Sequence, residues 1–191
     1  IFVNPLKTIH APYSQGNVAL FGENAGRQCV PMSLCSLIHV YCNGSMQNSS
    51  DLVNIMKLGN ELHSMLSRLS RQQYLLLTEL PTQVTIEDTN YSFQFSESYT
   101  GNLDVAFMNE TISFVMPLVF ALEKLQQETF NCFILTIEHN TVSIFTDSYG
   151  LLKLFDSHAR DVFGMPHPSG SCVLLEFHSF SNLTEYLKFF Y

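Results

Sequence analysis

Apolar residues recur at helical spacing in the first third of the chain. Between Cys29 and Tyr41 most of them fall three or four positions apart, which predicts a helix with one buried face. Pro31 lies in its first turn, where backbone amides have no intrahelical partner, so the proline is tolerated. A longer helix is predicted after Ser50 and Asp51, which can cap its first turn. The segment before both helices, residues 1–26, is rich in Pro, Gly, Asn and Ser and predicts an irregular arm over the domain.

The second half of the chain carries short runs of β-forming residues separated by turn residues. Turn residues at 140–141 and 147–150 closely follow such runs, which is typical of hairpins between consecutive strands. We therefore predict one antiparallel meander, with strands at Cys132–Ile137, Val142–Phe145, Leu151–Phe155 and Cys172–Phe177.

The remaining segments complete the predicted fold class. Pro117–Gln127 and Ser181–Tyr191 read as shorter helices, and Tyr74–Leu80 and Gln83–Phe95 are further runs rich in β-formers. Helices come first and the sheet follows, an order that predicts an α+β fold in which the N-terminal helices pack on an antiparallel sheet.

The composition predicts one folded domain. The 191 residues are 46% hydrophobic and 14% charged, which is far from the signature of disorder and sufficient for a single core. We therefore treat residues 1–191 as one domain, expected to be monomeric. Because the chain begins at Ile1, we expect it to be a segment of a larger protein. No apolar run reaches the roughly 18 residues that span a bilayer, so no membrane association is predicted.

Charge and cysteine content exclude several classes of partner and cofactor. The net charge is −8, with only 9 Lys and Arg residues, which argues against binding to nucleic-acid phosphates. The five cysteines contain no CxxC pair, and the histidines are scattered, so neither a disulfide framework nor a zinc site is indicated. We expect no metal or cofactor and a reducing compartment, the cytoplasm or nucleus.

The position of Cys29 favours a reactive thiol over a buried structural one. A free cysteine is ordinarily among the most buried residue types. Cys29, however, stands at the predicted helix N-terminus, where unpaired amides and the helix dipole favour a thiolate. A histidine with an acidic neighbour follows about 130 residues downstream, which is the chain order of papain-like cysteine proteases.

Asp156 and His158 stand two positions apart at the end of a predicted strand. On an extended backbone both side chains leave the same face, with Cα atoms about 6 to 7 Å apart. The carboxylate can then accept the Nδ1 proton of the imidazole, which leaves Nε2 to face a thiol. Asp-x-His tripeptides are common by chance, so the pair gains its meaning from Cys29.

Acyl transfer also needs hydrogen-bond donors for the oxyanion that develops on the substrate. The backbone N–H of Cys29 can supply one donor. A side-chain amide can supply the second, and both Gln15, in the upstream arm, and Gln28, beside the nucleophile, are candidates. Their spacing alone does not choose between them.

Four motifs in this order resemble one known family. They are Ser14-Gln15-Gly16, Asn24-Ala25-Gly26-Arg27-Gln28-Cys29, Thr78-Glu79-Leu80-Pro81 and Phe155-Asp156-Ser157-His158. Together they are similar to the deubiquitinase domain of herpesvirus large tegument proteins. The resemblance implies a papain-like fold, a single catalytic domain and hydrolysis of ubiquitin isopeptide bonds without a cofactor. It also implies Cys29 as nucleophile, His158 as base, Asp156 as its partner and Gln15 in the oxyanion hole, in a protein of the virion tegument and the infected host cell.

The expected substrate is ubiquitin or a polyubiquitin chain, whose extended tail carries arginines before its two terminal glycines. Acidic residues along the channel suit such a tail, and Glu79, Asp88 and Glu110 are candidates, although each is more often an ordinary surface acid. Phe21, Tyr99 and Phe163 are candidates for apolar contacts. Two alternatives stay open: the same chemistry on another ubiquitin-like modifier, and a catalytically inactive ubiquitin-binding module.

Overall fold

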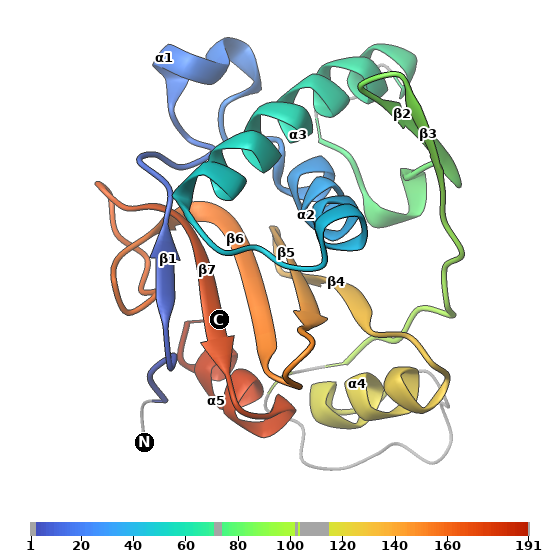
Figure 1. Cartoon of the computed structure of the whole chain (residues 1–191), viewed down its shortest axis with the longest axis vertical. Helices are drawn as coiled ribbons and strands as arrows, with labels where there is room; N and C mark the ends of the chain where they lie inside the picture. Colours follow the sequence, from blue (N-terminus) through green and yellow to red (C-terminus); the bar gives the residue numbers. More distant parts are fainter. Residues whose placement is uncertain (1–2, 71–73, 102, 104–114, 191) are drawn as a thin grey trace.

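The computed structural model describes residues 3–70, 74–101, 103 and 115–190. A five-stranded antiparallel sheet forms its centre, with helices on both sides (Figure 1). The strands are β1 (Thr8–His10), β4 (Cys132–Ile137), β5 (Asn140–Thr146), β6 (Leu152–Arg160) and β7 (Ser171–Phe177). Their order across the sheet is β1-β7-β6-β5-β4, so the last four strands form the predicted meander.

Two helices on one side of the sheet carry the N-terminal half of the core. They are α2 (Cys29–Asn43) and α3 (Ser49–Ser70), and both begin close to the predicted positions. Asn48 caps α3, because its side-chain oxygen accepts hydrogen bonds from the amides of Ser50 and Asp51 at 2.8 and 3.2 Å. The two helices bury a shared apolar cluster that also includes Phe155 and Leu174 of the sheet.

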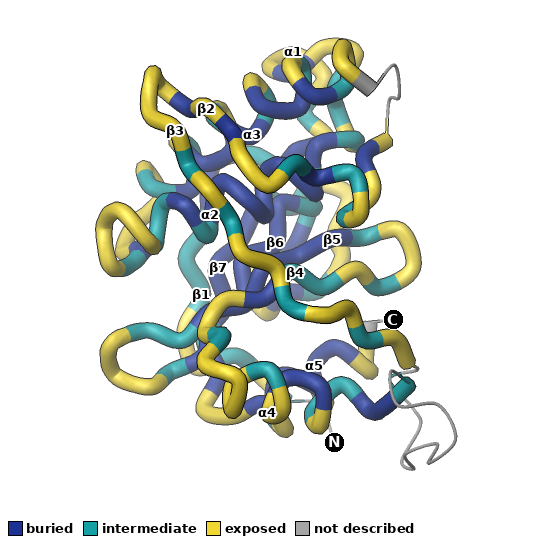
Figure 2. The backbone as a smooth tube through the Cα atoms, turned by 90° about the vertical axis from the view of Figure 1, so that its right-hand side faces the viewer, coloured by how far each residue is buried: buried dark blue, intermediate teal, exposed yellow. Residues whose placement is uncertain are grey.

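The other face of the sheet is covered by α4 (Leu118–Gln127) and α5 (Phe180–Phe190). Their apolar residues pack with Leu154, Val173 and Leu175 in a second cluster. Neighbouring residues of β6 and β7 therefore point into different cores, as the alternation of a strand requires. Figure 2 shows the result, with buried strands β5, β6 and β7 at the centre and exposed turns around them.

The N-terminal arm is only partly irregular. Residues 8–10 form β1 and pair with β7 in the register Thr8 with Leu175 and His10 with Val173. The prediction of an irregular arm is wrong for this segment, because a three-residue strand is too short to show a period of its own. The arm continues through α1 (Val18–Phe21) and a 3₁₀ turn at Gly22–Asn24.

The β-forming run at Tyr74–Leu80 does not form a strand. It contains a 3₁₀ turn at Leu77–Glu79, and the Glu79 carboxylate accepts a hydrogen bond from the Leu76 amide at 2.8 Å. Pro81 follows directly and cannot donate to a strand ladder. The next run does form a hairpin, β2 (Gln83–Ile86) with β3 (Thr89–Ser92), which is a sheet of its own.

Strand β6 runs five residues past its predicted end at Phe155, to Arg160. The apolar pattern stops at Phe155 because the following residues are polar, yet Asp156, Ser157 and Arg160 are all buried. The pairing of β6 with β7 shifts register between Asp156 and Arg160, which is typical of a β-bulge. No helix among the described residues is long and apolar enough to cross a membrane.

Candidate active site

Cys29 is the first residue of α2, as predicted. Its thiol is half-buried and lies where the unpaired amides of the first helical turn create a positive potential.

Gly59 of α3 lies where α3 contacts α2, the helix that begins at Cys29. A Cβ atom at Gly59 would stand 2.5 Å from Cγ and 2.7 Å from Cα of Met32, so the absence of a side chain lets the two helices approach closely.

The Gln28 side chain forms hydrogen bonds with the backbone just before Cys29 and with α3. It is fully buried, its Nε2 donates to Oδ1 of Asn60 at 3.1 Å, and its Oε1 accepts from the Arg27 amide at 3.2 Å. Asn24 also donates to Asn60 Oδ1, at 3.0 Å. These bonds anchor the approach to Cys29 on α3, and they leave the Gln28 amide occupied at both ends.

The Gln15 side chain lies against β6 instead. Its backbone N–H donates to the Ser157 carbonyl at 2.8 Å, and its carbonyl accepts from the Gly26 amide at 3.0 Å. The Ser157 hydroxyl donates to Gln15 Oε1 at 3.2 Å. The arm is thus fixed both to the strand that carries His158 and to the loop that precedes Cys29.

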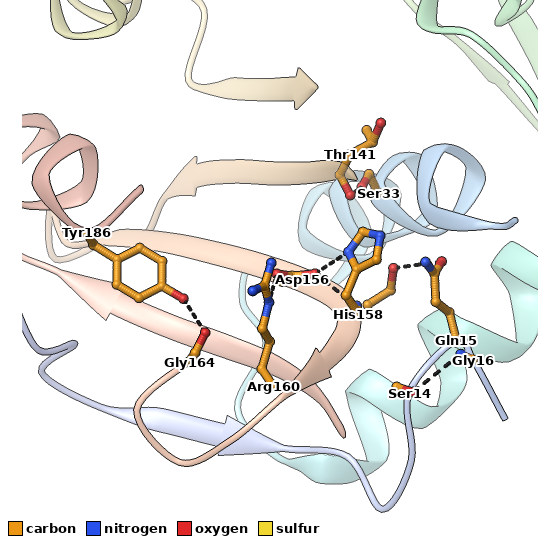
Figure 3. Close-up of polar contacts among 11 residues, drawn as sticks. Ser14, Gln15, Gly16, Ser33, Thr141, Asp156, His158, Arg160, Gly164 and Tyr186 are labelled. Carbon is orange, nitrogen blue, oxygen red and sulfur yellow. Dashed lines mark hydrogen bonds and ion pairs between the residues drawn. The ribbon is translucent and has the colours of Figure 1, made fainter. Parts of the chain in front are cut away.

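Asp156 links His158 and Arg160 (Figure 3). One carboxylate oxygen, Oδ1, lies 2.6 Å from Nδ1 of His158 and also accepts from the His158 amide at 2.9 Å. The other oxygen, Oδ2, accepts from Nε of Arg160 at 2.6 Å. Both carboxylate oxygens are therefore hydrogen-bonded, and Asp156 fixes the orientation of the His158 imidazole.

These contacts set the charge states of Asp156 and His158. Burial favours the neutral acid, but the nearby His158 and Arg160 outweigh it and hold the pKa of Asp156 well below its usual range. Burial likewise disfavours the imidazolium, yet Asp156 and the Cys29 thiol raise the pKa of His158 to about 9. The imidazole is therefore held in its protonated form at neutral pH.

Cys29 differs from the buried cysteines in its acidity. Burial raises the pKa of Cys35 to about 12 and also raises the pKa of Cys172. Burial acts in the same direction on Cys29, but hydrogen bonds with His158 and Thr141 and the charge of His158 bring its pKa below the ordinary value. All five cysteines of the chain are free thiols.

Thr141 is a contact of the thiol that the sequence analysis missed. Its backbone and side chain both help to lower the pKa of Cys29, and its carbonyl accepts from the Ser33 hydroxyl, one helical turn after Cys29, at 3.3 Å. The sequence marks Thr141 only as a turn residue between strands. Arg160 was also missed. It stands two residues after His158 and four after Asp156, so a predicted strand that continued past Phe155 would have placed all three on one face.

The other candidates fall in different surroundings. The Glu79 carboxylate is used in the 3₁₀ turn, Asp88 is exposed in the turn between β2 and β3, and Glu110 lies outside the described residues. Phe21 is buried, edge-on to Tyr13 at 5.9 Å between ring centroids. Phe163 remains 54% exposed.

Among the described residues, no three side chains of His, Cys, Asp and Glu gather closely enough to hold a metal ion. The polar groups of the site instead bond one another, so the arrangement suits chemistry carried by a thiol and an imidazole.

The fold is that of a viral ubiquitin-specific protease domain. The structure matches, with a TM-score of 0.82, the crystal structure of the ubiquitin-specific protease encoded by a tegument protein of murine cytomegalovirus, solved with a ubiquitin-based suicide substrate. The two sequences are 18% identical, and the match covers 97% of this chain and 80% of the other. The predicted α+β, papain-like fold is confirmed.

The chain belongs to the family described as herpesvirus tegument protein, N-terminal conserved region, which it matches over residues 10–190. It is 30% identical over 156 residues to the large tegument protein deneddylase of human herpesvirus 6B. That alignment covers 76% of this chain and 7% of the relative, so the chain spans a small fraction of that protein's length. The family predicted from the four motifs is thus confirmed.

Proposed function

We propose that this chain is a cysteine protease that hydrolyses the isopeptide bond after the C-terminal glycine of ubiquitin. The observation that carries the proposal is the line of contacts from Asp156 through His158 to Cys29, with the thiol at the start of a helix. Membership of the tegument family and the names of the matched proteins support the same chemistry.

The first half of the reaction forms an acyl-enzyme. The Cys29 thiolate attacks the glycine carbonyl carbon, and a sulfur–carbon bond forms as the carbonyl electrons move to oxygen. The Cys29 backbone N–H and Gln15 Nε2 are the proposed donors to this oxyanion. The tetrahedral species then expels the lysine amine, which takes a proton from His158 Nε2, and a thioester with a neutral imidazole remains.

The second half releases the product. His158 now accepts a proton from water, and the resulting hydroxide adds to the thioester carbonyl. The carbon–sulfur bond breaks, which returns the thiolate and the imidazolium and frees the ubiquitin carboxyl group. Asp156 keeps the imidazole oriented through both halves, because its Oδ1 holds Nδ1.

A second candidate substrate is the modifier that a deneddylase removes. The observation that favours it is the name of the herpesvirus 6B relative, which is a deneddylase. The chemistry at Cys29 is identical for both modifiers, so the substrate depends on contacts away from the thiol. We also propose that the chain acts as part of a larger tegument protein, in the cytoplasm or nucleus of the infected cell.

The test uses ubiquitin with a C-terminal propargyl group, the same probe built on the second modifier, and a ubiquitin–fluorophore amide substrate. We expect the ubiquitin probe to add to Cys29, as located by peptide mapping, and the substrate to be cleaved. Cys29→Ala is expected to abolish both reactions in a folded protein. The matched control is Cys42→Ala, since Cys42 is an exposed free cysteine on the same helix, and it should react like the wild type.

Three outcomes would change the proposal. Labelling by the other modifier alone would keep the chemistry and replace the substrate. Labelling of the Cys29→Ala variant would refute the assignment of the nucleophile. If neither probe adds to the folded wild type, the chain is a binding module, and the affinity for unmodified ubiquitin is then the quantity to measure.

A further inference from the structure

The Gln15 side chain has two ends with opposite chemistry. Its Nε2 can donate a hydrogen bond to an oxyanion, whereas its Oε1 carries lone pairs that would repel one. The two ends exchange when the terminal torsion turns by about 180°, and that torsion is broad and roughly two-fold. A group that bonds Oε1 therefore leaves Nε2 as the end that can donate to a substrate.

The Ser157 hydroxyl bonds the oxygen end of the Gln15 side chain. It donates to Gln15 Oε1 at 3.2 Å, and both side chains are buried, with exposed fractions of 0% for Ser157 and 3% for Gln15. In Figure 3 the hydrogen bond of the Gln15 side chain runs toward the strand segment that bears Asp156 and His158. With Oε1 held on β6, Nε2 stays available for the substrate.

We propose that Ser157 is a positioning residue that orients the Gln15 amide as an oxyanion donor. This inference rests on the function proposed above. Three consecutive residues of β6 then organise the site: Asp156 orients the imidazole, His158 transfers protons, and Ser157 aligns the donor amide. The backbone carbonyl of Ser157 adds a second link, because it accepts a hydrogen bond from the backbone N–H of Gln15 at 2.8 Å.

Ser157 is expected to affect kcat only through its contact with Gln15. Removing the hydroxyl leaves the Gln15 backbone anchored to β6 and to Gly26, but it frees the amide to turn. An oxyanion donor contributes about 100-fold or more to kcat, and a donor that is misoriented part of the time loses a share of that. We expect Ser157→Ala to lower kcat about tenfold, which is less than the full loss of about 100-fold, with KM within about twofold.

The experiment measures kcat and KM on the ubiquitin–fluorophore amide for four proteins: wild type, Ser157→Ala, Gln15→Ala and the double variant. A second reaction, alkylation by ubiquitin with a C-terminal 2-bromoethyl group, reports the thiol alone, because displacement of bromide creates no oxyanion. We expect Ser157→Ala to have no further effect on kcat in the Gln15→Ala background. Alkylation rates should agree within about twofold across all four proteins.

Several results would overturn the inference. An unchanged kcat in Ser157→Ala, or the same loss in both backgrounds, would mean that the hydroxyl does not act through Gln15. A slower alkylation in Ser157→Ala would place the defect at the thiol or the imidazole. If Ser157→Ala does not fold, Ser157→Cys replaces it, since a thiol fills similar space with a weak donor. A wild type that cleaves no substrate would remove the proposed function and this inference with it.

Discussion

The His158 imidazole lies between a carboxylate and a thiol, and both neighbours favour its protonated form. Its pKa is raised to about 9, while the pKa of Cys29 is lowered. The proposed reactive state pairs a thiolate with an imidazolium, so it needs Cys29 deprotonated and His158 protonated. Activity should therefore rise as pH increases through the lowered pKa of Cys29 and fall as pH increases through about 9.

Asp156→Asn tests this arrangement at the residue scale. Without the carboxylate, only the Cys29 thiol opposes the effect of burial, so the pKa of His158 falls. We expect the falling limb of the kcat/KM profile to move to lower pH and kcat to drop by about 100-fold, the scale of general acid–base catalysis. Hydrolysis of the ubiquitin–fluorophore amide between pH 5 and 10 gives the profile.

Asp88→Asn is the matched control for this change. Asp88 is exposed, and its φ of 64° is a conformation that asparagine also tolerates. The profile of this variant should superimpose on that of the wild type. If the falling limb of Asp156→Asn stays in place, the carboxylate does not set the charge of His158.

At the scale of elements, the contact between α2 and α3 positions Cys29, the proposed nucleophile. Gly59→Ala adds a methyl group to a helix, which by itself stabilises a helix by about 1 kcal/mol. In this fold the new Cβ would stand 2.5 Å from Met32 Cγ and 2.7 Å from its Cα, and the helices would have to separate. We expect the free energy of unfolding in urea to fall by about 2 kcal/mol through overpacking.

Asn54→Ala provides the comparison for Gly59→Ala. Asn54 is exposed on the same helix, so its replacement changes helix propensity without meeting α2, and the unfolding free energy should stay equal or rise slightly. A Gly59→Ala protein as stable as Asn54→Ala would show that α3 can shift without cost.

At the scale of the whole molecule, two cores share one sheet. Strands β6 and β7 supply residues to both apolar clusters, so loss of either cluster exposes the strands of the other. Leu183 of α5 is fully buried in the cluster on the face opposite α2. We expect Leu183→Ala to lower the free energy of unfolding by about 3 kcal/mol, in a single transition and with kcat within about twofold of the wild type.

Circular dichroism and tyrosine fluorescence, followed together in urea, check this prediction. Leu69→Ala is the control, because Leu69 is 77% exposed on α3 and its truncation should change stability by about 0.5 kcal/mol or less. Separate transitions for the two probes would mean that the cores unfold independently.

Much of this fold could be predicted where the apolar pattern is long and regular. The helix that begins at Cys29 and the meander of four strands follow from local periodicity. Short or polar segments were harder: the three-residue β1 shows no period, and the Tyr74–Leu80 run is β-forming in composition but ends at a proline. The end of β6 was missed because its buried polar residues bond one another rather than repeat an apolar pattern.

The sequence by itself determined the candidate catalytic residues and the elements on which they lie. Asp156 and His158 stand two apart on one strand, and Cys29 opens a helix, so local geometry already relates them to their elements. Only the tertiary structure decided that Gln28 bonds Asn60 while Gln15 bonds Ser157, 142 positions away in sequence, and that Arg160 and Thr141 complete the surroundings of the site. The physical reason is that such contacts depend on how the arm, α2 and the sheet pack together, and packing between distant segments leaves no local period in the sequence.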